Sequence, residues 1–109
     1  MTEPTARIRV LLVDDHAVVR RGLRGFLELH GDIEIVGEAA DGSAAVEAAG
    51  KLRPDVVVMD LVMPELDGIG AISRIRAADQ AIEVVALTSF VEEERVAAAL
   101  EAGAAGYLL

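Results

Sequence analysis

The chain has 109 residues and a formal net charge of −9; 53% of the residues are hydrophobic and 3% are aromatic. That length suits one small domain with a core of Val, Leu, Ile and Ala. The absence of cysteine excludes disulfides and thiolate metal sites, and the negative charge disfavours nucleic-acid binding by this chain alone. No apolar stretch reaches the ~18 residues that span a bilayer, so we expect a cytoplasmic protein without membrane contact.

Strand and helix patterns alternate in the first half of the chain. Residues 8–13 (IRVLLV) are an apolar run that predicts a buried strand, and residues 16–30 predict a helix. One face of that helix carries Val19, Leu23, Phe26 and Leu27. Residues 33–39 alternate like a strand, and the alanine-rich residues 44–52 predict a helix that Pro54 ends.

The second half repeats this alternation. Residues 56–59 (VVVM) are another apolar run, and isoleucines at helical spacing follow Gly68. A strand over 82–88, a helix over about 91–101 and a short fifth strand in 104–109 complete the pattern. Continuous Val, Ile and Leu runs indicate strands buried on both faces. The order therefore predicts an α/β fold of three layers, with helices on both sides of a parallel sheet.

Three of the predicted strands end in acidic or hydroxyl residues. The first ends at Asp14 and Asp15, the third at Asp60 and the fourth at Thr88. Open α/β sheets bind ligands at the carboxyl ends of their strands, so in a strand order of 2-1-3-4-5 these side chains would converge on one shallow pocket. The structural alternative is that Asp14 and Asp15 only cap the next helix and that Asp60 only shapes a turn.

The chemistry of such a pocket favours phosphoryl transfer. Three carboxylates at close range repel one another, and a divalent cation removes that repulsion. Oxygen ligands without cysteine favour Mg²⁺, which also accepts a phosphate oxygen. Asp60 would be the nucleophile that forms an acyl phosphate, and Thr88 would donate its hydroxyl to a phosphoryl oxygen.

Other residues near the strand ends have plain structural interpretations. An oxygen site for Mg²⁺ has no need of imidazole, so we expect His16 to be an exposed residue at a helix start. Arg20, Arg21 and Arg24 form a basic patch, either a solvated helix face or a docking surface. Gly68 allows either a close approach of two backbones or a positive φ.

Four stretches, VLLVDD, VVVMDLVMPELDG, VVALTSF and GAAGYLL, resemble the receiver domain of bacterial response regulators. DDHAVVRRGLRGFLE and VGEAADGSAAVEAA are most similar to the NarL/FixJ (LuxR-type) class of two-component transcription regulators. The likeness spans essentially the whole chain. It implies a flavodoxin-like, doubly wound sheet of five parallel strands in the order 2-1-3-4-5.

The resemblance also implies a role for each matching position. Asp60 would be the phosphoacceptor. The Mg²⁺ ligands would be Asp14, Asp15, Asp60 and the backbone carbonyl of Val62. Thr88 would be the switch hydroxyl that moves toward the phosphoryl group, and Tyr107 the aromatic that changes rotamer with it. Such a domain is no enzyme in the usual sense, since it phosphorylates only itself and loses the phosphoryl group slowly.

Partners follow from the same resemblance. The phosphoryl donor would be a sensor histidine kinase, activation would favour a homodimer, and DNA would be bound only by a C-terminal helix-turn-helix domain absent here. Receivers of this class continue past GYLL with a lysine and a fifth helix. We therefore expect residues 1–109 to be one receiver domain truncated before its last helix. The sheet face that the missing helix would cover should expose apolar side chains, to be covered by a partner chain, a swapped element or further residues.

The alternative is a flavodoxin-like domain that binds a small molecule or cofactor. A cobalamin site would need glycine where Val19 stands, and the acidic DDHAVVR has the wrong charge for an FMN phosphate loop. Phosphatases with a D-x-D nucleophile after the first strand do not match either, because Asp14 is followed by Asp15 and His16.

Overall fold

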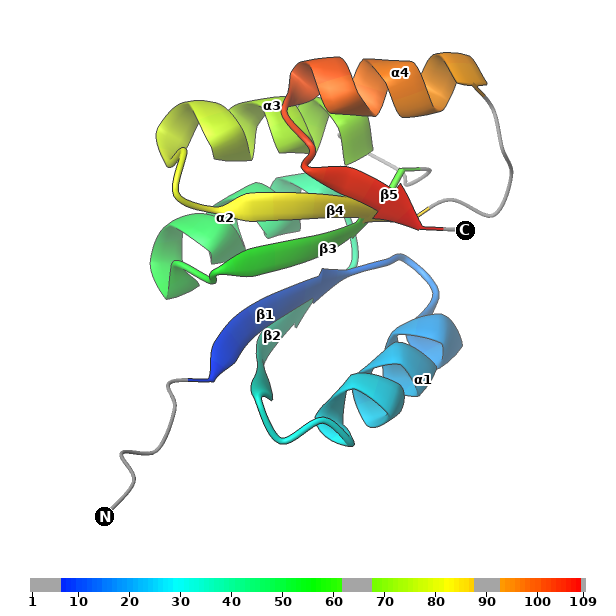
Figure 1. Ribbon diagram of the computed structural model, residues 1–109, viewed down its shortest axis with the longest axis vertical. Coiled ribbons are helices and arrows are strands. Elements are labelled where there is room, and N and C mark those ends of the chain that lie inside the picture. The colour runs from blue at the N-terminus through cyan, green and yellow to red at the C-terminus, as the bar shows by residue number, and fades with distance from the viewer. Residues whose placement is uncertain (1–6, 62–67, 88–92, 109) are drawn as a thin grey trace.

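The structure is a computed structural model that describes residues 7–61, 68–87 and 93–108. Strands and helices alternate along these residues (Figure 1). They are β1 Ile8–Val13, α1 Ala17–Glu28, β2 Ile33–Ala39, α2 Gly42–Leu52, β3 Val56–Asp60, α3 Gly68–Ala78, β4 Glu83–Leu87, α4 Glu93–Ala102 and β5 Gly106–Leu108. None of the helices in the described ranges is long and apolar enough to cross a membrane.

The strands form one parallel sheet in the order β2-β1-β3-β4-β5, which confirms the predicted order. Among the described residues no helix follows β5. The capping residues of two helices show why α2 begins and α4 ends where they do. Asp41 caps α2 by accepting a hydrogen bond from the N–H of Ala44 at 2.7 Å. Gly103 ends α4 with a φ of 121°, a conformation that glycine adopts without strain.

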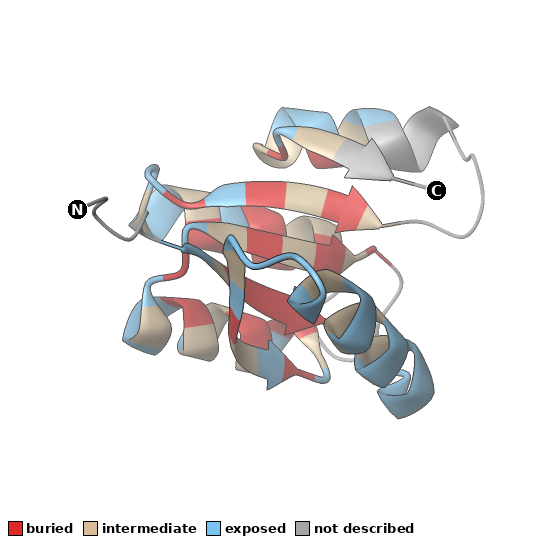
Figure 2. Cartoon of the chain, turned by 60° about the horizontal axis from the view of Figure 1, so that its bottom comes forward, coloured by how far each residue is buried: buried red, intermediate tan, exposed pale blue. Residues whose placement is uncertain are grey.

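The two faces of the sheet are covered unequally. Helices α2, α3 and α4 lie on one face and α1 on the other (Figure 1). The larger core lies under the three helices, where Leu11, Val57 and Ile72 are fully buried. The smaller core consists of Val10, Leu12 and Ile35 with the partly buried Leu23 and Leu27 of α1. Figure 2 shows how much of α1 remains exposed.

Half of the apolar face predicted for α1 does not enter the core. Leu23 and Leu27 pack on the sheet, whereas Val19 is 46% exposed and Phe26 is 62% exposed. Helix α1 contacts β2 and β1, and its arginines reach toward β2. At 100° per residue, Val19 and Phe26 lie on the opposite flank, which is turned toward β3 and β4. No described helix covers the sheet there, so these two side chains stay exposed, and the ring of Phe26 meets that of His30 edge to face with 5.6 Å between their centroids.

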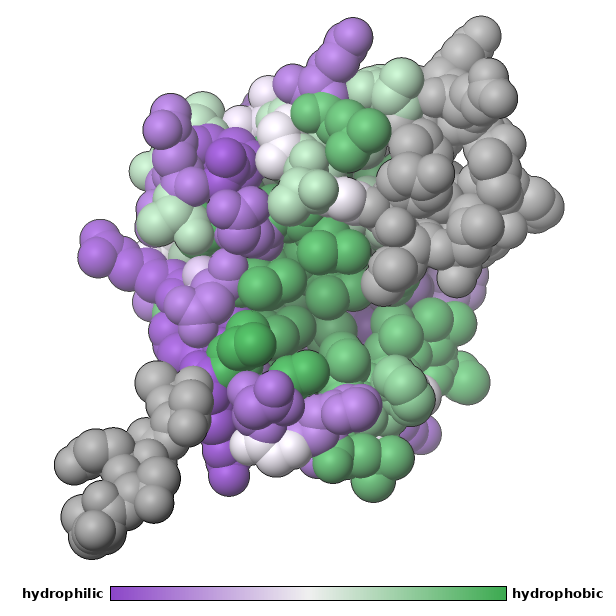
Figure 3. Space-filling model, viewed as in Figure 1, coloured by the Kyte–Doolittle hydropathy of each residue, from purple (hydrophilic) through white to green (hydrophobic). Residues whose placement is uncertain are grey.

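That uncovered area is called the open sheet face below. It consists of Val56, Val58, Val85 and Leu87, all of which are partly exposed. The register places them on the side of the sheet that α1 covers only over β1 and β2. Figure 3 shows the corresponding apolar surface over the middle of the molecule. The exposure that the sequence predicted for this face is confirmed.

Candidate functional site

The strand order brings the predicted acidic residues to one edge of the sheet. Val13 pairs with Met59, so Asp14 and Asp60 come next on neighbouring strands at the same level. One ligand atom each from Asp14, Asp15, Asp60 and His16 lie within 4.8 Å of one another. The predicted convergence is therefore confirmed for the three aspartates, which are called the acidic cluster below.

Asp14 is the most firmly held member of the cluster. It is 5% exposed, and its N–H donates to the carbonyl oxygen of Ala39 at 3.1 Å. Its Oδ1 accepts from the N–H of His16 at 2.8 Å, and its own carbonyl accepts from Arg20 at 2.6 Å. The residue at the N-cap of α1 is His16, not either acid. Asp14 therefore does not cap α1, because the N–H that donates to its Oδ1 belongs to the N-cap residue and not to the helix.

His16 lies closer to the acids than the sequence indicated. Its side chain is 69% exposed, as expected for a residue at a helix start. Its Nδ1 nevertheless lies 3.2 Å from Oδ1 of Asp14 and 3.0 Å from Oδ1 of Asp15. Adjacency in the sequence was the only signal for this contact, because the direction of the ring depends on the turn that leads into α1.

The donor set of the acidic cluster fits Mg²⁺. Three carboxylates offer hard oxygen ligands, and the chain has no sulfur donor from cysteine. Part of the cluster is open to solvent, because Asp15 is exposed and Asp60 is only partly buried. A cation held there would keep coordination positions for water and for a phosphate oxygen, which are the ligands that Mg²⁺ usually adds to one or two carboxylates. In the ranges that the structure describes, no other group of this composition is found.

Three predicted residues are not placed in the site by the structure. Thr88 and Val62 lie outside the described residues. Leu87, which precedes Thr88, pairs with Asp60 across β3 and β4. The backbone of Tyr107 belongs to β5, where it pairs with Ala86. The roles of Thr88, Val62 and Tyr107 stay predictions.

A second polar group borders the acidic cluster and was missed by sequence analysis. Glu38 at the end of β2 binds two arginines of α1: Arg20 Nε donates to Oε1 at 3.0 Å and Arg24 donates to Oε2 at 2.6 Å. The hydrogen bond from Arg24, then that from Arg20, lowers the pKa of the Glu38 carboxyl below its ordinary value of 4.5. Two members of the predicted basic patch are therefore paired, and only Arg21 is plainly a solvated residue.

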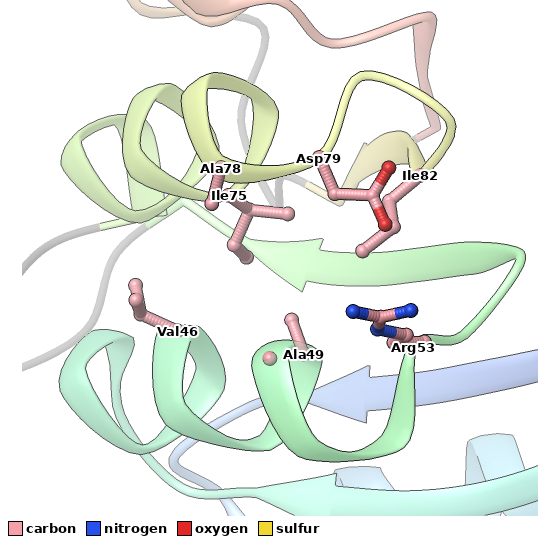
Figure 4. Close-up of a pocket in the computed structure, with 8 residues that line it drawn as sticks. Val46, Ala49, Arg53, Ile75, Ala78, Asp79 and Ile82 are labelled. Atoms are coloured by element: carbon pink, nitrogen blue, oxygen red, sulfur yellow. The ribbon is translucent and has the colours of Figure 1, made fainter.

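The structure also contains a small cavity away from the acidic cluster. It holds about 130 Å³ and lies between α2 and α3 (Figure 4). Figure 4 shows Val46, Ala49 and Ile75 between the helices, with Arg53 and Asp79 toward one end. Because Arg53 precedes β3 and Ile82 precedes β4, the cavity lies at the amino ends of these strands. It is therefore no part of the acidic site at their carboxyl ends.

Comparison with known proteins agrees with this geometry. The family described as the response regulator receiver domain matches residues 10–109. The chain is 51% identical over 102 residues to the transcriptional regulatory protein LiaR of Bacillus subtilis, an alignment that covers 94% of this chain and 48% of LiaR. The chain thus spans about half the length of the curated relatives it matches.

Solved structures extend the agreement to the fold. The signal receiver domain of the response regulator NarL from Mycobacterium tuberculosis superposes with a TM-score of 0.91 at 38% identity, over 95% of this chain and 84% of that chain. A chain of the CheX–CheY–BeF₃–Mg²⁺ complex from Borrelia burgdorferi gives 0.89 at 28% identity, over 95% of this chain and 78% of that one. The chain therefore belongs to the response regulator receiver domains, and its relatives place it in their NarL/FixJ class.

Proposed function

We propose that this receiver domain accepts a phosphoryl group on Asp60 in a reaction that needs Mg²⁺. The observation that carries the proposal is the convergence of Asp14, Asp15 and Asp60 within 4.8 Å at the carboxyl edge of the sheet. The similar chain from Borrelia burgdorferi was solved in a complex with BeF₃ and Mg²⁺, which supports the same ion here. The alternative of a phosphate-bearing cofactor is disfavoured, because the cluster's negative charge would repel it.

Each residue has a separate part in the proposed reaction. A carboxylate oxygen of Asp60 attacks the phosphorus of a phosphohistidine on a sensor kinase; an O–P bond forms, the N–P bond breaks, and the imidazole leaves. Asp14 and Asp15 would hold Mg²⁺, which supplies positive charge to the transferring phosphoryl group. The backbone carbonyl of Val62 would be a further ligand, and Thr88 would donate its hydroxyl to a phosphoryl oxygen. Hydrolysis of the acyl phosphate later restores Asp60.

Phosphorylation would act as a switch between two conformations. Thr88 and Tyr107 would change position together, and the switched form would associate as a homodimer. The relatives named as transcriptional regulators are about twice as long as this chain. We therefore propose that the output lies in a C-terminal helix-turn-helix domain that binds DNA and that the working protein is cytoplasmic.

Intact-mass spectrometry with acetyl phosphate tests the proposed function. The protein is expected to gain the mass of one phosphoryl group when Mg²⁺ is present and to gain far less when a chelator removes it, because the acidic cluster then repels the anionic donor. Acid-stable addition elsewhere is distinguished by hydroxylamine, which cleaves an acyl phosphate. Equal addition with and without Mg²⁺, or none at all, would contradict the proposal.

The open sheet face predicts how the chain behaves when it is studied as residues 1–109. We expect this form to bind an apolar dye and to self-associate, because Val56, Val58, Val85 and Leu87 are partly exposed on one surface. A form extended past Leu109 should lose both properties, since the added residues would cover that face. Dye fluorescence and sedimentation velocity on the two forms measure this. A short form that stays monomeric and dye-free would show that the face needs no cover.

A further inference from the structure

The side chain of Arg20 joins the acidic cluster to the rest of the fold. One guanidinium nitrogen donates to the carbonyl oxygen of Asp14 at 2.6 Å, and Nε donates to Oε1 of Glu38 at 3.0 Å. The side chain is only 19% exposed. Arg20 is therefore held between the β1–α1 turn and the end of β2, because its planar guanidinium donates a hydrogen bond to each of them.

An irregularity in the sheet puts Glu38 within reach. Val10 pairs with Ile35, but the next residue of β1, Leu11, pairs with Gly37, so β2 carries one extra residue. Past this bulge Glu38 pairs with Leu12 and shares the sheet face that α1 covers. Without the bulge it would point to the other face. Bulges commonly re-aim a side chain beside a functional site, and this one aims Glu38 at the arginines of α1.

Helix α1 has little else to fix it. None of its residues is buried, and its N-cap makes no side-chain hydrogen bond. Apolar contact is limited to the partly buried Leu23 and Leu27. The ion pairs of Arg20 and Arg24 with Glu38 therefore add polar links between α1 and β2 to these few apolar contacts.

We propose that Arg20 is a positioning residue for the metal site. By bridging the Asp14 carbonyl and the Glu38 carboxylate, it fixes the peptide plane from which both Asp14 and Asp15 project. This inference rests on the proposed binding of Mg²⁺. A peptide unit is planar, so fixing the Asp14 carbonyl also fixes where the backbone of Asp15 begins. The N–H of Asp14 is already bound to Ala39, which leaves this peptide as the remaining freedom in the turn.

Charge alone predicts the opposite effect, which makes the proposal testable. Arg20 is a cation close to a site for a cation, so a purely electrostatic role means that its removal strengthens metal binding. A positioning role means that its removal weakens metal binding, because the two carboxylates lose their common orientation. Residues that orient metal ligands typically contribute about 10–100-fold to affinity.

The experiment is a titration of the full-length protein with Mn²⁺, followed by electron paramagnetic resonance of the free ion and by competition with Mg²⁺. Arg20→Ala is expected to weaken binding on the order of tenfold. Arg20→Lys keeps the charge but not the planar fork, so it should also bind more weakly than the parent. Arg24→Ala is the matched control: it removes an arginine of the same helix that binds the same Glu38 but has no contact with Asp14. It should change affinity less than twofold.

The outcomes separate this inference from the proposed function. If the parent protein binds no Mn²⁺, the metal-dependent function fails and the inference fails with it. If the parent binds but Arg20→Ala binds equally or more tightly, only the positioning role is overturned. Thermal unfolding of the Arg20 and Arg24 variants shows whether both lose similar stability, in which case a metal affinity lost only by Arg20→Ala supports positioning. Should Arg20→Ala not fold, Arg20→Lys decides: parent-like affinity overturns the proposal.

Discussion

Replacing Asp60 with asparagine is expected to abolish formation of the phosphoryl adduct. Asparagine has nearly the shape of aspartate but no charged oxygen that can attack phosphorus, so the pocket remains while the nucleophile is lost. Intact mass after incubation with acetyl phosphate and Mg²⁺ measures the effect. Asp32→Asn is the matched control, because Asp32 lies in the exposed turn before β2, outside the acidic cluster, and it should form the adduct like the parent.

Asp60→Asn has a second expected effect that does not depend on a phosphoryl donor. Without metal, three carboxylates within 4.8 Å repel one another. Removing one of these charges should raise the free energy of unfolding of the metal-free protein by about 1 kcal/mol, and Mg²⁺ should then stabilise the variant less than the parent. Thermal unfolding with and without Mg²⁺ measures both effects.

For the adduct itself, an Asp60→Asn variant that still forms it at the parental rate would place the nucleophile elsewhere and contradict the proposed site.

The acidic cluster was predictable because its parts are local in the sequence. Each of two apolar runs ends in aspartate, and parallel pairing brings the ends of neighbouring strands to one edge. The burial of Leu11 and Val57 likewise followed from continuous apolar runs, which only a strand covered on both faces requires. Once the order of the strands was known, the meeting of Asp14 with Asp60 needed no further information.

The contacts around Glu38 were not predictable in the same way. A regular alternation over residues 33–39 puts Glu38 on the face opposite Ile33 and Ile35, away from the arginines of α1. The bulge beside Leu11 reverses its side, and pairing register is a property of two strands rather than of one sequence pattern. From the sequence, Arg20 and Arg24 therefore belonged to a basic patch without a partner, although in the fold both bind Glu38.

Burial on α1 failed to follow the pattern for a related reason. Helical periodicity finds a face, but which part of that face is covered depends on what lies beside the helix. Leu23 and Leu27 pack on the sheet over β1 and β2, whereas Val19 and Phe26 lie on the flank of α1 nearest the open sheet face and are exposed. The sequence indicated an uncovered face on this side of the sheet but not that it would reach α1.

Replacing Gly68 with alanine is expected to destabilise the fold and to slow phosphorylation together. Gly68 is the buried first residue of α3, and a Cβ there would lie 2.6 Å from Cα of Leu61 and still closer to the carbonyl oxygen of Asp60. Its φ is not positive, so of the two sequence interpretations the close approach is the right one. The obstacles are backbone atoms that no rotamer change moves, so either α3 or the backbone of Asp60 must shift. Overpacking of this kind costs about 3 kcal/mol.

Gly50→Ala in α2 is the control for this substitution, because a Cβ at Gly50 meets nothing within 4 Å. In a helix interior with free space, alanine is expected to stabilise the protein by about 0.5–1 kcal/mol, since glycine loses more backbone entropy on folding. Urea unfolding measures both variants, and the rate of phosphorylation by acetyl phosphate shows whether Asp60 has moved. If Gly68→Ala matched the parent in stability and rate, α3 would have to lie farther from the phosphoacceptor strand than this packing requires. Lower stability and slower phosphorylation for Gly68→Ala, with a gain in stability and an unchanged rate for Gly50→Ala, would instead show that the contact between α3 and Asp60 fixes the position of the nucleophile.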